Sequence, residues 1–102
     1  MSVTPDNSGR MQAIRQRLEE SLAPSQLKVR DDSHKHVGHA GARDGRGHFA
    51  VSIVSERFSG MLPVARHRAV YQALGELMQT DIHALQIRAL SPAEAAELPD
   101  AD

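Results

Sequence analysis

The chain has 102 residues, of which 40% are apolar and 25% are charged, the composition of one ordinary globular domain. Its 12 Lys and Arg against 13 Asp and Glu argue against a protein whose main task is to coat nucleic acid or an acidic membrane. Because there is no Cys, any metal must be held by His, Asp or Glu, or by the thiols of a partner. No apolar stretch has the length of a signal sequence or a membrane span, and we expect a cytoplasmic protein.

The charges are distributed unevenly along the chain. Residues 10–90 contain all 12 basic residues but only 8 of the 13 acidic ones. The segment from Ser91 onward contains acidic residues and no basic residue. We therefore expect a mildly basic domain followed by a short acidic tail.

The first predicted elements are a flexible lead-in over residues 1–10, a helix and two strands. The helix is indicated by apolar residues at spacings of three and four, namely Met11, Ile14, Leu18 and Leu22, and Pro24 ends it. Alternation over residues 27–32 predicts a short strand that leads into a glycine-rich loop. Residues 48–54 predict a second strand, whose core face consists of Phe49, Val51 and Ile53.

A second long helix is predicted from Pro63 to Met78, with Pro63 in its first turn. Its apolar stripe consists of Val70, Tyr71, Leu74, Leu77 and Met78. A third strand follows, in which Leu85, Ile87 and Ala89 alternate. The sequence from Ser91 to Glu94 is a capping box with Pro at the first helical position, so the acidic tail over residues 93–102 should carry a short, weak helix.

The element order is therefore α-β-β-α-β-α. The first two strands can pair antiparallel, and the second strand, second helix and third strand form a βαβ unit with parallel strands. This order predicts a small α+β domain with a three-stranded mixed sheet and two main helices on one face.

A loop rich in histidine carries the first candidate site. Three of the six histidines, His34, His36 and His39, lie within six residues of each other. Such a loop is either a solvated segment without a specific role or a set of imidazole ligands for a metal ion. The spacing does not match the ligand sets of structural zinc sites. Uptake of zinc or nickel by the loop alone therefore remains a separate hypothesis.

His67 is the second candidate, because it lies between Arg66 and Arg68 in the first turn of the second helix. Taken alone, this position favours a structural histidine at the edge of the core, bonded to a backbone carbonyl. His48 and His83 begin the second and third strands, and we expect structural or solvent-facing roles for both.

Signals of catalysis are weak. The sequence has no G-x-S-x-G elbow, phosphate-binding loop or dinucleotide fingerprint. Asp31 and Asp32 are neighbours in a predicted strand and should point to opposite faces, so they cannot act as a pair. We therefore expect that the protein is not an enzyme.

Three arginines suggest a nucleic-acid contact at the start of the second helix: Arg57, Arg66 and Arg68. They could contact phosphates in a salt-sensitive manner. The sequence from Gly38 to Gly41 matches a GxxG string, but it lies between two strands instead of between two helices. We take this match as coincidental.

Several of these segments together resemble the BolA-like protein family. Residues 29–36 look like its first strand and loop, and residues 48–60 are similar to its second strand and turn. The Arg66-His67-Arg68 helix resembles the signature helix of the family, and residues 82–85 resemble its third strand. The resemblance covers residues 11–92 and implies a class II KH-like domain, which agrees with the element order.

The resemblance also implies a function. BolA-like proteins act as partners of monothiol glutaredoxins and share a glutathione-ligated [2Fe–2S] cluster, in iron–sulfur trafficking or iron regulation. It implies that His67 is one metal ligand and that the second comes from the loop, where His36 matches the position best and His34 and His39 lie beside it. A cysteine-free chain can complete such a site with imidazole, as in Rieske centres.

A second implied role is transcription regulation through DNA, for which this sequence offers the arginines at the start of the second helix. We expect no membrane partner, and a monomer or weak homodimer when the protein is alone.

Overall fold

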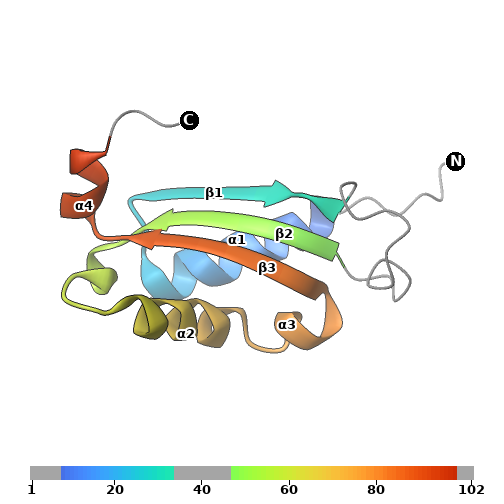
Figure 1. Cartoon of the computed structure of the whole chain (residues 1–102). Coiled ribbons are helices and arrows are strands. Elements are labelled where there is room, and N and C mark those ends of the chain that lie inside the picture. Colours follow the sequence, from blue (N-terminus) through green and yellow to red (C-terminus); the bar gives the residue numbers. More distant parts are fainter. Residues whose placement is uncertain (1–7, 34–46, 99–102) are drawn as a thin grey trace, which may run out of the picture.

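A computed structural model describes residues 8–33 and 47–98 of the chain (Figure 1). The elements in chain order are α1 (Ser8–Leu22), β1 (Gln26–Asp31), β2 (Gly47–Val54), the short 3-10 helix η3 (Glu56–Phe58), α2 (Pro63–Leu74), α3 (Leu77–Thr80), β3 (Ile82–Leu90) and α4 (Pro92–Glu97). Among these described segments, no helix has the length and apolar character needed to cross a bilayer.

The three strands form one mixed sheet in the order β1-β2-β3. The central strand β2 pairs antiparallel with β1 and parallel with β3. Helices α1 and α2 contact each other and lie on one face of the sheet (Figure 1). The predicted α+β fold with a three-stranded mixed sheet is thus confirmed.

The core lies between this sheet and the two long helices. The predicted inward residues of β2 are buried, with Phe49 and Val51 each 2% exposed and Ile53 fully buried. They belong to the same cluster as Ile14 and Leu18 of α1. The alternation in β2 and the helical spacing in α1 therefore identified the core correctly.

The predicted second helix is interrupted, which corrects the expectation of one helix from Pro63 to Met78. Helix α2 ends at Leu74, and Gly75 adopts a left-handed backbone with φ of 56°, which glycine tolerates and other residues disfavour. Tyr71 is 42% exposed and is not part of the buried stripe. The buried stripe of α2 repeats every four residues and consists of Arg66, Val70 and Leu74.

Helix α1 begins at Ser8, three residues before the helix predicted from the apolar spacing. Arg10 lies in this added turn and its Nε donates a hydrogen bond to Asp81 Oδ2 at 3.0 Å. The contact joins the start of α1 to the residue that precedes β3. Residues 1–7, the remainder of the expected lead-in, lie outside the described residues.

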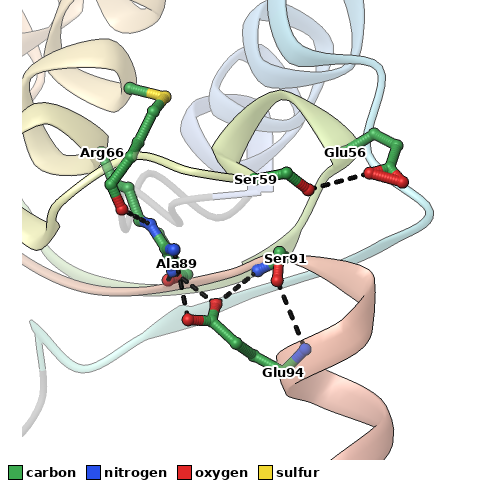
Figure 2. Close-up of polar contacts among 7 residues, drawn as sticks. Glu56, Ser59, Arg66, Ala89, Ser91 and Glu94 are labelled. Atoms are coloured by element: carbon green, nitrogen blue, oxygen red, sulfur yellow. Dashed lines mark hydrogen bonds and ion pairs between the residues drawn. The ribbon is translucent and has the colours of Figure 1, made fainter.

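A buried arginine ties the start of α2 to β3 and α4 (Figure 2). Arg66 is 8% exposed, and its Nε donates to the carbonyl of Met61 at 2.8 Å. Its Nη1 donates to the carbonyl of Ala89 at 3.0 Å and to Glu94 Oε1 at 2.6 Å, while Nη2 lies 3.2 Å from Glu94 Oε2. A buried guanidinium needs such partners, because leaving it unpaired would cost about 3–5 kcal/mol.

The same glutamate completes the predicted capping box of α4. The backbone N–H of Ser91 donates to Glu94 Oε1 at 2.8 Å, and Ser91 Oγ accepts from the N–H of Glu94 at 3.3 Å. The hydrogen bonds from Arg66, followed by that from the Ser91 backbone, lower the pKa of Glu94 to about 2. The prediction of a capping box with Pro92 at the first helical position is confirmed.

We predict that Phe49→Ala lowers the free energy of unfolding by about 3–5 kcal/mol, because it removes a fully packed ring and leaves a cavity. Urea unfolding measures the change. Tyr71→Ala is the matched control, since this exposed ring should cost below about 1 kcal/mol. A similar small loss for Phe49→Ala would contradict the assigned core face.

We predict that Glu94→Gln flattens the acid limb of the stability curve. The pKa of Glu94 is lower in the folded chain than its ordinary value of 4.5, so its contribution is fully present above that pH. The contribution is lost as the pH falls toward about 2. Melting temperatures between these pH values should fall less steeply for Glu94→Gln than for the native chain.

Glu97→Gln is the control for this measurement, since Glu97 lies in the same helix and makes no ion pair within the described part of the chain. Its acid limb should follow that of the native protein. An equal flattening in both variants would show that the Arg66–Glu94 contact has no special role.

Candidate functional site

His67 lies on the outer side of α2. The helix buries every fourth residue starting with Arg66, so the next two residues, His67 and Arg68, are turned outward and are exposed. Within the described residues, the His67 side chain makes no hydrogen bond or ion pair. The interpretation of His67 as a structural histidine bonded to a carbonyl therefore has no support in the described contacts.

Apolar side chains surround His67 on this outer side. Val64 and Tyr71 lie one turn before and after it and are 63% and 42% exposed. Leu62, just before the helix, is 76% exposed. We call Val64, His67, Arg68 and Tyr71 the α2 stripe. Exposed apolar residues gathered around a polar one are typical of a surface that contacts another protein.

The loop histidines His34, His36 and His39 lie outside the described residues, but both ends of their loop are described. The N–H of Asp32 donates to the carbonyl of His48 at 2.7 Å, and the N–H of His48 donates to Ser33 Oγ at 3.0 Å. The N–H of Gly47 donates to the carbonyl of Asp81 at 3.0 Å. Both ends of the loop are therefore held at the end of the sheet where β3 begins (Figure 1).

His83 lies at this same end of the sheet. Gly47 and His48 are consecutive in β2, but their partners in β3 are Ile82 and Ala84, so His83 is an additional residue at a break in the register. Such bulges redirect side chains and occur often beside functional sites. The His83 ring is 5.1 Å from the His48 ring between centroids, and His83 is exposed while His48 is buried.

His67 belongs to the opposite end of the sheet. Its neighbour Arg66 bonds to Ala89, and the seven residue-to-residue steps from Ile82 to Ala89 span about 23 Å of strand at ~3.3 Å per step. When two imidazoles bind one metal ion, a nitrogen of each lies about 2 Å from the ion, so the two histidines must be close together. The described ends of the histidine loop thus lie beside His83 and on the order of 20 Å from the part of α2 that carries His67.

We expected a structural or solvent-facing role for His83, and its side chain is exposed, but the sequence analysis did not place it beside the histidine loop. One signal could have identified it: two parallel strands begin at the same end of a sheet, and the His83 strand is parallel to the one that follows the histidine loop. No group of three or more His, Asp or Glu in residues 8–33 and 47–98 is placed to hold a metal ion. A metal at this end would need further ligands from the loop or from a partner.

The three arginines predicted to contact nucleic acid do not form one surface. Arg66 is buried and its guanidinium is fully engaged, so it is not available to a phosphate. Arg57 and Arg68 are exposed. The correction follows from the four-residue repeat of α2, which turns Arg66 inward and Arg68 outward.

Comparison with known proteins places these features in a family. The family described as BolA-like protein matches residues 18–94. The mouse "BolA-like protein 1" is 44% identical over 90 residues, which cover 88% of this chain and 64% of the mouse protein. The Vibrio cholerae "DNA-binding transcriptional regulator BolA" is 41% identical over 81 residues, covering 79% of this chain and 74% of that protein.

The solved structures agree with this relationship. The solution structure of the BolA1 protein from Mus musculus superposes with a TM-score of 0.79 at 39% identity, covering 100% of this chain and 80% of that chain. The chain spans less than two thirds of the length of the mouse sequence relative. BolA-like proteins are non-enzymatic regulators or adaptors, which agrees with the prediction that the domain over residues 18–94 is not an enzyme. By its sequence match and its fold, the chain belongs to the BolA-like protein family.

Proposed function

We propose that the protein is an adaptor that binds a monothiol glutaredoxin and shares a glutathione-ligated [2Fe–2S] cluster with it, in iron–sulfur trafficking or iron regulation. The observation that carries the proposal is the exposed imidazole of His83 beside both ends of the histidine loop, in a chain without Cys. A cluster needs ligands on two irons, and this chain has no Cys, so the thiolates must come from the partner and glutathione.

The donor chemistry at this end of the sheet fits such a shared cluster. Two imidazoles can replace two thiolates on one iron, as in Rieske centres, and they make the cluster less negative. In our proposal His83 is one ligand and one of His34, His36 and His39 is the second. His83 takes the role that the resemblance assigned to His67, because the ends of the loop lie beside His83.

The α2 stripe, together with Leu62 just before the helix, supports the proposed contact with a partner protein. Leu62, Val64 and Tyr71 expose apolar surface around His67. Burying such side chains against a partner yields about 25 cal/mol per Å² of apolar area. In this proposal, His67 contacts the partner protein instead of the iron.

We predict that His83→Ala and His67→Ala have different effects on the shared cluster. When the protein is mixed with a monothiol glutaredoxin that carries its glutathione-ligated cluster, the visible circular dichroism spectrum should change, because imidazole replaces a thiolate on iron. His83→Ala should abolish this new spectrum. His67→Ala should preserve its shape and shift only the protein concentration needed to produce it.

Each variant is the control for the other, since both remove one exposed imidazole. Loss of the new spectrum in His67→Ala with retention in His83→Ala would return the ligand role to His67. An unchanged glutaredoxin spectrum after addition of the native protein would contradict the adaptor function itself.

A second candidate function is transcription regulation through DNA. It is favoured by the relative from Vibrio cholerae, whose name describes a DNA-binding transcriptional regulator. The exposed cations at the start of α2, Arg57 and Arg68, are the residues that would contact phosphates. With Arg66 engaged inside the protein, only two of the three predicted arginines support this role.

We predict that any affinity for duplex DNA at this surface falls with salt with a log–log slope of about −2, as expected for two phosphate contacts at ~0.9 each. Fluorescence anisotropy with a labelled duplex at several salt concentrations measures the slope. The double variant Arg57→Gln/Arg68→Gln should remove this salt-dependent binding. An affinity that is independent of salt would exclude this electrostatic mode.

A further inference from the structure

A basic trough lies on the face of the sheet that is turned away from α1 and α2. It is a hollow of about 260 Å³ lined by residues of all three strands, among them Lys28, Arg30, Ala50, Ser52, Gln86 and Arg88. Their neighbours along the outer strands, including Val29 and Ile87, pack against the core. Because successive residues of a strand point to opposite faces, the listed polar side chains point away from the helices.

The shape of the trough follows from the register of the strands. Ser52 of the central strand lies between Lys28 and Arg88, and Ala50 lies between Arg30 and Gln86. The central strand thus carries small side chains and both outer strands carry long ones. The result is a channel along β2 whose walls stand about 9–10 Å apart, twice the spacing of neighbouring strands.

The walls of the trough are positively charged. Among the described residues that line it, three are cationic and none is acidic. Arg30 is bonded to Asp32 through two hydrogen bonds, of 2.8 and 3.1 Å, so its charge is partly balanced. Lys28 and Arg88 face each other across the Ser52 hydroxyl without an acidic residue in the same row. An anion placed above Ser52 would be attracted by both cations and could accept a hydrogen bond from the hydroxyl.

We propose that this trough binds a single strand of nucleic acid through its sugar–phosphate backbone, with one phosphate held between Lys28 and Arg88 above Ser52. A phosphodiester chain carries charge at every unit and has no backbone N–H or C=O groups that require partners. An extended acidic peptide does have such groups, and the face of a sheet cannot satisfy them, because the backbone of β2 is already paired with β1 and β3. Peptides add to sheets at an edge strand instead.

The mode of binding follows from the lining. No aromatic ring is among the described residues that line the trough, so bases are not stacked on it and their sequence is not read. Binding depends on phosphate contacts, is independent of sequence and weakens with salt. The trough lies on a different surface from the start of α2, and the proposal does not depend on the adaptor function.

Fluorescence anisotropy with a labelled, mixed-sequence single strand of DNA tests the proposal. The double variant Lys28→Gln/Arg88→Gln should lower the affinity at low salt by about tenfold or more and reduce the log–log salt slope by about 0.7, the value for the one phosphate that both cations contact. The comparison variant Arg57→Gln/Arg68→Gln removes the same charge from the α2 side, the surface of the second candidate function, and should lower the affinity for the single strand by less than the trough variant does.

All four substituted side chains are exposed, so both double variants should keep the native melting temperature and far-ultraviolet circular dichroism spectrum. Ser52→Val is a third variant, which fills the channel and leaves every charge in place. It should weaken binding several-fold without changing the salt slope.

Several results would overturn the proposal. These are an absence of binding by the native protein at low salt, an equal loss of affinity in the two double variants, or unchanged affinity in Ser52→Val. A competition experiment provides a fourth such result, with both competitors compared at equal concentrations of negative charge. If a polyglutamate peptide displaces the labelled strand more effectively than the unlabelled strand does, the ligand is an acidic polypeptide and the proposal is wrong.

Discussion

The parallel pairing of β2 with β3 is the constraint on which the rest of the structure depends. Parallel neighbours cannot be joined by a tight turn, so the chain must cross over one face of the sheet between them. The crossover contains η3, α2 and α3, and α2 covers the core together with α1. The same pairing makes β2 and β3 begin at one end of the sheet. Because β1 is antiparallel to β2, it ends where β2 begins, so His48, His83 and both ends of the histidine loop lie at this end of the sheet.

The two ends of the sheet consequently have different chemistry. At the end where β3 begins, two imidazole rings lie 5.1 Å apart beside the loop. At the end where β3 finishes, Arg66 bonds to Ala89 and Glu94 and fixes the start of α2 against β3 and α4. The second cluster is structural, whereas at the first end the imidazole of His83 is exposed and can contact a ligand. Neighbouring residues in the Arg66-His67-Arg68 motif therefore serve different purposes, one internal and two external.

Local sequence patterns predicted the elements but not the contacts between distant residues. Alternation in β2 identified Phe49, Val51 and Ile53 as core residues because a strand with one buried face imposes a period of two. The apolar residues after Gly75 continue the helical spacing, so nothing in the pattern revealed that the chain turns there. Tyr71 was assigned to the core because it adjoins Val70, although the buried repeat of α2 begins at Arg66.

The site was harder to predict than the fold for a physical reason. Arginine is rarely buried, and the partners that bury Arg66 are 23 and 28 residues away in the sequence. The exposed position of His83 at the start of β3 depends on a break in the register between β2 and β3, which no short-range pattern records. The resemblance to BolA-like proteins supplied the family, and the strand order is the reason why we propose His83 instead of His67 as the ligand.

The outer face of the sheet bears on function because solubility alone does not explain its pattern. Charges of alternating sign would be enough to keep this face soluble, and each pair of opposite charges on neighbouring strands would add about 0.2–1 kcal/mol of stability. Here Lys28 and Arg88 flank Ser52 in one row, and Asp32, whose carboxylate bonds to Arg30, is not among the described residues that line the hollow. The repulsion between Lys28 and Arg88 destabilises the folded chain. An anion bound between them is attracted by both cations, so the net electrostatic energy of the row becomes favourable. Small residues along β2 leave the space in which that anion fits.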